Sequence, residues 1–303
     1  MKTIKIGTRG SRLALWQAEY IEKLLHEKYP EIKTELVVIK TEGDTDQQSS
    51  LSKIGGQGVF TKTIENALLD YKIDLAVHSL KDLPSKMTEG LRLAAVPERG
   101  PAEDVLISAN GHALSDLPYN ARIATGSIRR KSQLMNLRPD LLISDLRGNI
   151  ETRLDKLYNQ KLDGIIMARA AVVRLELKDI NYAILNTVGM IPAVGQGAIG
   201  VQIREEDNAI MSLVGELNHR HTFREIAAER ALLNELDSGC RFPIGGFAKI
   251  TDDILVLNGF IGSEDGKIIY KEIVSGKAEK AEELGRKLAK KYKDLGADRL
   301  LIN

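Results

Sequence analysis

The chain has 303 residues, 43% of them hydrophobic and 28% charged, and its 43 Lys and Arg nearly balance 42 Asp and Glu, for a net charge of +1. This composition is typical of a globular protein of two or three domains and excludes a disordered or collagen-like chain. The near-neutral charge argues against a protein that holds nucleic acid by bulk charge. No apolar run approaches the roughly 18 residues of a membrane span, and the first residues lack the apolar core of a signal peptide. We therefore expect a cytoplasmic protein without a nucleic-acid or membrane partner.

Cysteine and histidine usage narrows the chemistry further. Cys240 is the only cysteine, so an intramolecular disulfide and a CxxC metal site are excluded. The five histidines have no zinc-finger or HExxH spacing, and we expect no metal. His219 and His221 either form a metal-binding pair or decorate a helix end.

Short apolar stretches alternate with helical periodicity along the first two thirds of the chain. Ser11 is placed as an N-cap before Ala14, Ala18, Ile21 and Leu25, which recur on one helix face. This rhythm predicts mostly parallel sheets covered by helices. The expected strands are residues 4–7, 36–39, 74–79, 91–96, 122–125, 141–146 and 164–168, and the expected helices after the first are 60–71, 127–137 and 150–160.

Two clusters rich in proline or glycine, which interrupt helices and strands, and a change in the pattern of expected helices and strands divide the chain. Pro97-Glu-Arg-Gly-Pro101 is a plausible hinge, and Pro192-Ala-Val-Gly-Gln-Gly197 is a second crossing. From about Glu205 the pattern becomes α+β, which predicts a smaller third domain. It contains expected helices up to 218 and over 223–236, strands over 254–261 and 267–274, and a helix over 278–295.

The segment 41–58 consists almost entirely of loop-forming residues. Loops of this length are uncommon in compact domains and are usually functional or mobile. The segment is either a lid over a site or a surface insert.

Three strand ends carry arginines beside small hydroxylated residues or glycine. They are Gly7-Thr-Arg-Gly-Ser-Arg12, Thr125-Gly-Ser-Ile-Arg-Arg130 and Leu146-Arg-Gly-Asn-Ile-Glu-Thr-Arg153. Helix N-termini bind anions, and arginine adds bidentate recognition of carboxylate or phosphate. Because ligands of open α/β sheets bind beyond the carboxyl ends of the strands, the set indicates a ligand with several acidic groups. For any single arginine, a surface salt bridge is the competing interpretation.

For two further positions, the sequence composition alone leaves more than one interpretation open. Lys81 and Asp82 follow the expected strand 74–79 and are either a solvated turn or an acid–base site. Cys240 lies in Gly-Cys-Arg between a helix and a strand, where a lone cysteine is usually a small buried hydrophobe.

Seven segments in order resemble the porphobilinogen deaminase (hydroxymethylbilane synthase) family. They are Gly-Thr-Arg-Gly-Ser-Arg-Leu-Ala-Leu-Trp-Gln-Ala (7–18), Ala-Val-His-Ser-Leu-Lys-Asp-Leu-Pro (76–84), Ser-Ile-Arg-Arg (127–130), Leu-Arg-Gly-Asn-Ile-Glu-Thr-Arg-Leu (146–154), Pro-Ala-Val-Gly-Gln-Gly-Ala (192–198), Ala-Ala-Glu-Arg (227–230) and Gly-Cys-Arg-Phe-Pro-Ile-Gly (239–245). The resemblance implies an α/β fold with two lobes like type II periplasmic binding proteins, plus a smaller C-terminal α+β domain. It implies domain 1 over 1–97 and 198–217, domain 2 over 103–192, and domain 3 over 220–303.

The same resemblance implies an enzyme that condenses four porphobilinogen molecules head to tail into a linear tetrapyrrole and releases ammonia at each step. It further implies a dipyrromethane cofactor that is held by a thioether to Cys240 and primes the reaction. No sequence feature demands more than a monomer, so a monomer is the expected state. Asp82 would be the catalytic residue, stabilising the cation left when ammonia departs and moving protons. The implied cofactor-binding residues, besides Cys240, are Ser79, Lys81, Thr125, Ser127, Arg129 and Arg130. The implied substrate-binding residues are Arg9, Ser11, Gln17, Arg147, Arg153, Arg174 and Gln196, with Lys53 and Phe60 in a lid.

Some positions depart from the family pattern. Gly126 replaces a usual serine and removes one hydroxyl contact, and Arg169 is an extra cation near a strand end. The other departures are Gln57, Ser238 and Arg241. Two competing functions remain: a non-catalytic polycarboxylate-binding protein, and a nucleic-acid-binding regulator, which the near-neutral charge disfavours.

Overall fold

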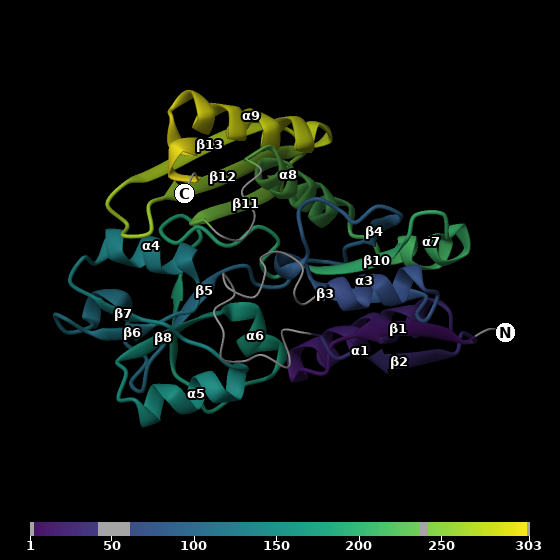
Figure 1. Cartoon of the computed structure of the whole chain (residues 1–303), viewed down its shortest axis with the longest axis horizontal. Helices are drawn as coiled ribbons and strands as arrows, with labels where there is room; N and C mark the ends of the chain where they lie inside the picture. The colour runs from purple at the N-terminus through teal and green to yellow at the C-terminus, as the bar shows by residue number, and fades with distance from the viewer. Residues whose placement is uncertain (1–2, 42–60, 237–241, 302–303) are drawn as a thin grey trace. The chain divides into compact units, whose positions relative to one another are not determined.

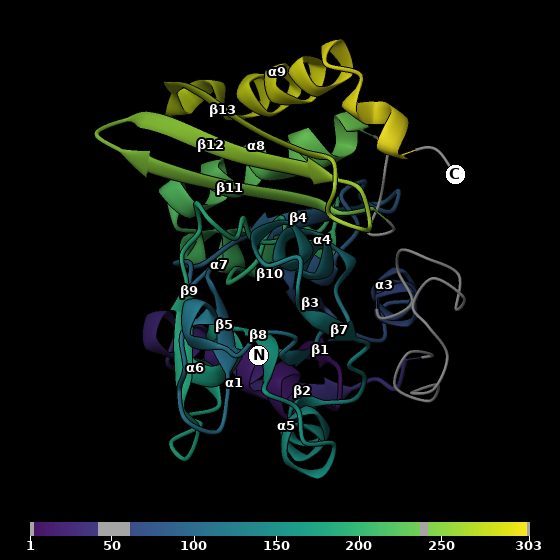
Figure 2. The same cartoon turned by 90° about the vertical axis from the view of Figure 1, so that its left-hand side faces the viewer.

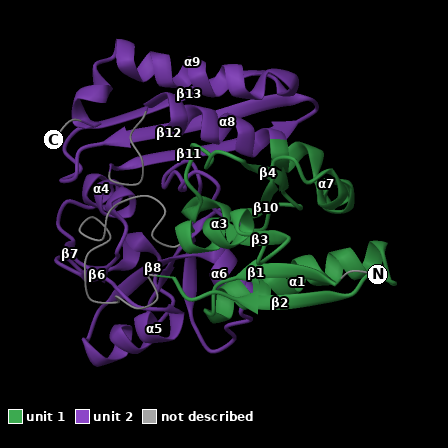
Figure 3. Cartoon of the chain, turned by 45° about the vertical axis from the view of Figure 1, so that its right-hand side comes forward, with its two compact units in different colours: residues 1–100, 197–223 green, residues 101–196, 224–303 purple. Residues whose placement is uncertain are grey.

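The computed structural model describes residues 3–41, 61–236 and 242–301. Two compact units make up the chain, 1–100 with 197–223 and 101–196 with 224–303 (Figure 3). Each unit therefore consists of two separate stretches of the sequence. In the described ranges, no helix has both the length and the apolar character needed to cross a membrane.

The first unit is built on a five-stranded sheet in the order β2-β1-β3-β10-β4 (Figure 1). Strands β1, β2 and β3 pair in parallel, whereas β10 is antiparallel to both of its neighbours. Helices cover both faces, because α1 and α7 pack into one hydrophobic core and α3 into another. The elements are β1 (Ile4–Thr8), α1 (Arg12–Lys28), β2 (Thr34–Val38), α3 (Lys62–Leu69), β3 (Leu75–Ser79), β4 (Leu91–Ala95), β10 (Ile199–Arg204) and α7 (Asn208–Val214).

The second unit contains a sheet of similar design in the order β7-β6-β8-β5-β9. Here β6, β7 and β8 are parallel and β5 is antiparallel to β8 and β9. Helix α4 packs into the core on one face, and α5 and α6 into the core on the other. The elements are β5 (Asp104–Ile107), β6 (Arg122–Ala124), α4 (Ile128–Leu137), β7 (Leu142–Ser144), α5 (Ile150–Asn159), β8 (Gly164–Ala168), α6 (Arg169–Arg174) and β9 (Tyr182–Leu185).

The expected α/β class is confirmed, but each five-stranded sheet is mixed, with two parallel and two antiparallel pairings. The structure also adds elements that periodicity did not predict. These are β5, β9, β10, β11 and α6. Strands β5 and β10 are buried along their whole length, so they lack the alternation that marks a half-exposed strand. Each is the first strand after one of the two crossing segments and is the antiparallel strand of its sheet.

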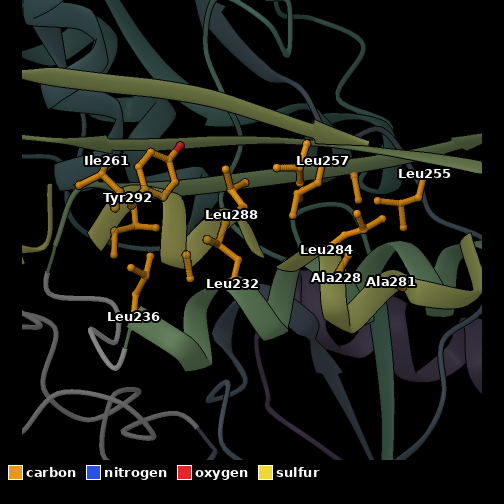
Figure 4. Close-up of a cluster of buried hydrophobic side chains, with 14 of the residues drawn as sticks. Ala228, Leu232, Leu236, Leu255, Leu257, Ile261, Ala281, Leu284, Leu288 and Tyr292 are labelled. Carbon is orange, nitrogen blue, oxygen red and sulfur yellow. The ribbon is translucent and has the colours of Figure 1, made fainter. Parts of the chain in front are cut away.

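The rest of the second unit is a three-stranded antiparallel sheet in the order β11-β12-β13 with two long helices (Figure 2). Its elements are α8 (Arg220–Leu236, from residue 224 onward in this unit), β11 (Ile244–Thr251), β12 (Ile254–Gly262), β13 (Ile269–Lys277) and α9 (Ala281–Asp294). The sequence predicted the two helices and two of these strands. Side chains of α8 and α9 point toward β12, where Leu232, Leu288 and Tyr292 join Leu257 and Ile261 in one core (Figure 4).

The free edge of β11 is completed by side chains of α8 and by the second crossing segment. Glu225 and Glu229 of α8 accept hydrogen bonds from the backbone N–H groups of Ile250 (2.9 Å) and Ala248 (2.8 Å). Glu229 also accepts the N–H of Gly195 at 2.7 Å. One buried carboxylate thereby ties β11 and α8 to the segment that precedes β10, which satisfies N–H groups that an edge strand would otherwise leave unpaired.

Candidate active site

In the first unit, the β1–α1 turn carries the predicted residues Arg9, Ser11 and Gln17. The Ser11 side chain accepts the N–H of Ala14 at 3.3 Å, which confirms it as the N-cap of α1. Gln17 is buried, and its Nε2 donates to Ser79 Oγ at 2.8 Å. The structure therefore brings Gln17 together with Ser79 at the end of β3.

Lys81 and Asp82 lie directly beyond β3 in the helical turn Leu80–Asp82. The buried side chain of Leu80 and a hydrogen bond from its N–H to Ala198 O (3.1 Å) anchor this turn to the segment before β10. The Asp82 side chain is exposed and Lys81 is half-buried. A carboxylate on a fixed backbone but open to solvent can contact a ligand and exchange protons.

Behind this turn lies a chain of buried polar side chains that the sequence did not predict. His78 Nε2 lies 3.0 Å from Gln202 Oε1, and Gln202 Nε2 donates to Glu65 Oε1 at 2.8 Å. The Gln202 carbonyl oxygen can only accept, so His78 donates from Nε2. Desolvation by burial lowers the pKa of His78 to about 4, with a smaller lowering from the charge of Arg9, while the Gln202 hydrogen bond opposes the shift. His78 is therefore neutral near pH 7.

In the second unit, Arg129 and Arg130 lie in the first turn of α4 and both are buried. Asp104, the fully buried first residue of β5, accepts hydrogen bonds from both. Its Oδ2 accepts from Arg129 Nη2 at 2.8 Å, and its Oδ1 accepts from Arg130 Nε at 3.0 Å and Nη2 at 2.7 Å. Arg129, Arg130 and Asp104 form one ionic cluster, which the spacing of residues in the sequence does not predict.

Two positive groups and one negative group leave this buried cluster with a net positive charge. Burial alone would raise the pKa of Asp104, but attraction to Arg129 and Arg130 and their hydrogen bonds hold it well below its usual range. Burial also lowers the pKa of Arg129, and Asp104 opposes that shift. In the described part of the chain, Arg129 Nε is buried and makes no hydrogen bond. One further acidic group would balance the charge of the cluster.

Three other predicted residues lie in or near the arginine cluster. Gln196 is buried, and its Nε2 donates to Asp104 Oδ1 at 2.8 Å and to Ala102 O at 2.7 Å. Ser127 is the N-cap of α4 and accepts the N–H of Arg130 at 3.4 Å. Thr125 is buried at the end of β6, and its Oγ1 accepts the N–H of Ser127 at 3.2 Å.

The corner between β7 and α5 carries Arg147 and Arg153, both half-buried. Arg147 Nε donates to Asp145 Oδ2 at 2.8 Å, and Arg153 Nε donates to Gly148 O at 2.8 Å. This corner closely approaches the α4 turn, because a Cβ on Gly126 would lie 2.4 Å from Leu146 O. The missing side chain at position 126 therefore has a steric reason in this chain.

For the remaining candidate residues, the structure gives few contacts or does not describe the residue. Arg174 is buried at the end of α6. Arg169, at the start of α6, donates from Nη1 to Glu103 Oε1 at 3.2 Å. Cys240, Lys53 and Phe60 lie outside the described residues, as do Gln57, Ser238 and Arg241. In the ranges that can be described, no group of three or more metal-ligating side chains occurs.

The predicted residues thus form two groups, one in each unit. In the first unit are Arg9, Ser11, Gln17, Ser79, Lys81 and Asp82, and in the second are Thr125, Ser127, Arg129, Arg130, Arg147, Arg153, Arg174 and Gln196. Sequence reasoning missed Asp104, His78 and Gln202. Asp104 and Gln202 lie on the antiparallel strands β5 and β10, which the periodicity had also missed.

Comparison with known proteins covers almost the whole chain. Residues 4–212 match the family model "Porphobilinogen deaminase, dipyromethane cofactor binding domain", and residues 223–294 match "Porphobilinogen deaminase, C-terminal domain". A porphobilinogen deaminase of Syntrophomonas wolfei is 45% identical over 301 residues, which is 99% of this chain and 98% of that one. One of Chlorobium phaeobacteroides is 46% identical over 304 residues, 99% of this chain and 97% of that one.

The solved structures that align with this chain include solute-binding proteins. An ancestral cationic amino acid solute-binding protein aligns with a TM-score of 0.45 at 12% identity, over 71% of this chain and 87% of that one. A probable amino-acid transporter binding protein of Bacillus subtilis aligns with a TM-score of 0.45 at 13% identity, over 72% and 91%. The family models and the full-length relatives establish that this chain belongs to the porphobilinogen deaminase family.

Proposed function

We propose that this chain is a porphobilinogen deaminase, a transferase of tetrapyrrole biosynthesis. It condenses four porphobilinogen molecules head to tail into hydroxymethylbilane and releases one ammonia for each. The observation that carries the proposal is identity of 45% to a relative of that name over 99% of this chain. The alternative of a non-catalytic polycarboxylate-binding protein is not favoured, because it accounts for neither family model.

A dipyrromethane cofactor fits the residues of the second unit. Each of its rings carries an acetate and a propionate, so the group brings several carboxylates into the protein. The Asp104 cluster has one uncompensated buried positive charge and a buried N–H of Arg129 without a partner in the described residues. A buried charge of this kind is costly unless it is paired, and a carboxylate supplies the partner. When bound, the cofactor supplies the carbon to which the first substrate is joined.

The residues of this chain then divide into holding and reacting groups. We assign Arg129, Arg130, Thr125, Ser127, Ser79 and Lys81 to the acid groups of the cofactor, and Cys240 to its thioether. The half-buried Arg9, Arg147 and Arg153 can bind acid groups of incoming porphobilinogen from partly exposed positions, with Ser11, Gln17, Arg174 and Gln196 in support. Charge-assisted hydrogen bonds of this kind contribute about 1.5–3 kcal/mol each.

Asp82 is the group we assign to the chemical steps. Loss of ammonia from porphobilinogen leaves a cation that the pyrrole ring stabilises. A carboxylate near the ring can accept the pyrrole N–H and lower the energy of that cation. The exposed side chain on the fixed turn after β3 can also carry a proton to the leaving amine and remove one from the new bond.

We also propose three domains, over 1–97 with 198–217, 103–192 and 220–303. The pairing of β10 with β3 and β4 supports the first, because it places residues 199–204 in the sheet of the N-terminal segment. Cytoplasmic location, a monomeric state and a lid containing Lys53 and Phe60 stay predictions.

The experiment that tests the proposal is the mass of the denatured protein, measured beside Cys240→Ser, together with porphobilinogen consumption and ammonia release. An adduct of two pyrrole units on the wild type, absent from Cys240→Ser, would establish the cofactor and its anchor together. A wild-type protein that stays unmodified and inert after incubation with hydroxymethylbilane and porphobilinogen would contradict the proposal.

A further inference from the structure

The side chain of Asp104 is central to the second unit, yet the proposed reaction gives it no role. Both of its oxygens accept hydrogen bonds from guanidinium groups, at 2.7 to 3.0 Å. It is fully buried on β5, which is paired on both sides by β8 and β9. Since an inner strand moves little, Asp104 gives the two arginines a fixed point of attachment.

Each guanidinium is held from a second direction as well. Arg129 Nη1 donates to Ile191 O at 2.6 Å, and Arg130 Nη1 donates to Ile166 O at 3.0 Å. A planar guanidinium that is bonded on two edges cannot rotate freely, so its remaining N–H groups keep fixed directions. A pre-ordered donor set loses less entropy when an acid group binds.

The charge of the cluster leads to the same conclusion. Without Asp104, two guanidinium groups would share a buried site with a combined charge of +2 and would repel each other. With it, the charge is +1, which one carboxylate neutralises. Gln196 Nε2, which also donates to Asp104 Oδ1, adds orientation without adding charge.

We infer that Asp104 is a positioning residue for the primer: its carboxylate fixes the two α4 guanidiniums so that one acid group of the dipyrromethane completes the cluster. This inference rests on the proposed function, because the acid group belongs to the proposed cofactor. Asp104 itself does not touch the reacting atoms. It acts through Arg129 and Arg130.

The test follows conversion of the apoprotein to the primed form by denatured mass after hydroxymethylbilane is added. Asp104→Asn removes the charge, and Asp104→Glu keeps the charge but moves the carboxylate by one methylene. We expect both to slow priming by about tenfold or more, because charge-assisted bonds to both guanidiniums lose their geometry. The matched control is Asp140→Asn, which removes the Arg138–Asp140 ion pair (2.7 Å) of the same unit and should leave the priming rate within about twofold.

A second comparison distinguishes positioning from general stabilisation. In an Arg130→Gln background, adding Asp104→Asn should slow priming by less than about twofold, because a residue that acts through Arg130 has little left to position. Equal slowing by Asp104→Asn in both backgrounds would overturn the inference. The melting temperature of every variant is measured beside its priming rate, so that a loss of folded protein is recognised.

The outcomes separate this inference from the proposed function. A wild-type protein that neither primes nor consumes porphobilinogen would remove the proposed function and the inference together. If the wild type does both, priming of Asp104→Glu at the wild-type rate would overturn the inference alone. A failure of Asp104→Glu to fold would also overturn it, since Asp104 would then be part of the structural framework only.

Discussion

The two five-stranded sheets share one strand layout but differ in how they accommodate buried polar groups. In each, three parallel strands are followed by an antiparallel strand that enters from a crossing segment, and then by an edge strand. In the first sheet the antiparallel strand β10 contributes Gln202, which is bonded to a neutral His78. In the second sheet the antiparallel strand β5 contributes Asp104, which is bonded to two arginines.

We propose that the buried and the half-buried arginines serve two kinds of ligand, a resident cofactor and an exchanging substrate. Arg129 and Arg130 are buried and held by several partners, and such cations suit a cofactor that stays bound through many cycles. Arg9, Arg147 and Arg153 are half-buried, and partly hydrated cations suit a substrate that must enter and be passed on. Since Arg147 and Arg153 belong to the same unit as Arg129 and Arg130, the proposed roles differ with burial and not with the choice of sheet.

The largest expected effect concerns Asp82, the residue of the first unit to which we assign the chemical steps. Asp82→Ala should lower porphobilinogen turnover by about 10²–10⁴ in the primed enzyme, the range for loss of a general acid–base. Because the Asp82 side chain is exposed, the melting temperature should change little. Asp70→Ala, which removes another exposed aspartate of the same unit, is the control and should keep wild-type turnover. Wild-type turnover by a fully primed Asp82→Ala protein would contradict the assigned role.

The next prediction tests the resident and exchanging classes of arginine against each other. Arg147→Gln should lower kcat/KM for porphobilinogen by about 10–100-fold, the value of one charge-assisted interaction, while the primed fraction stays normal. Arg130→Gln should instead lower the primed fraction. Denatured mass and steady-state kinetics on the two variants check this. The division fails if Arg147→Gln blocks priming, or if Arg130→Gln primes fully and only raises KM.

The elements and site residues that could be predicted are those whose evidence lies within a short stretch of the sequence. The α1 helix, the α4 turn and the arginines after β1, β6 and β7 follow from short patterns of capping, periodicity and strand ends, and the structure places them there. Strand β10, Ile-Gly-Val-Gln-Ile-Arg, combines glycine, glutamine and arginine and is buried throughout, so its strand character depends on its neighbours β3 and β4. Asp104 is one acidic residue among 42, and it is distinguished by its contacts with residues 25, 26 and 92 positions away.

The buried groups also predict different responses of the two units to acid. Unfolding exposes His78, whose pKa rises from about 4 in the folded protein to its ordinary 6.5. The stabilisation from a neutral His78 is therefore complete above pH 6.5 and is lost as the pH falls toward 4, because the unfolded chain then binds the proton. The loss should reach the order of 3 kcal/mol. Asp104, with a pKa well below its usual range, keeps its stabilising charge through this window.

Trp16, the only tryptophan, lies in the first unit and provides a probe of it. The urea midpoint followed by Trp16 fluorescence should fall more steeply from pH 7 to pH 4.5 in the wild type than in His78→Gln. The variant keeps a polar group at the position but has no proton to gain. Identical pH dependence in the two proteins would show that His78 does not set the acid sensitivity of the first unit.

The smallest expected effect compares the glycines that precede the N-cap serines of α1 and α4. A Cβ on Gly126 would lie 2.4 Å from the backbone oxygen of Leu146, whereas a Cβ on Gly10 would lie 3.2 Å from a methyl group of Val38. A backbone carbonyl cannot move without displacing the corner that carries Arg147, but a valine side chain can shift slightly. Gly126→Ala should therefore lower the free energy of unfolding by about 1–3 kcal/mol, as overpacking does. Gly10→Ala should lower it by much less.

Thermal unfolding of the two alanine variants measures this difference, and the KM for porphobilinogen shows whether it extends to the site. If the Gly126 turn fixes the Arg147 corner, Gly126→Ala should also raise KM, whereas Gly10→Ala should not. Equal melting temperatures for the two variants would show that the close approach at Leu146 is not a constraint. In that case Gly126→Ser should leave the free energy of unfolding unchanged. Packing would then not explain why this chain has no hydroxyl at position 126, and the explanation would lie in how the site binds acid groups.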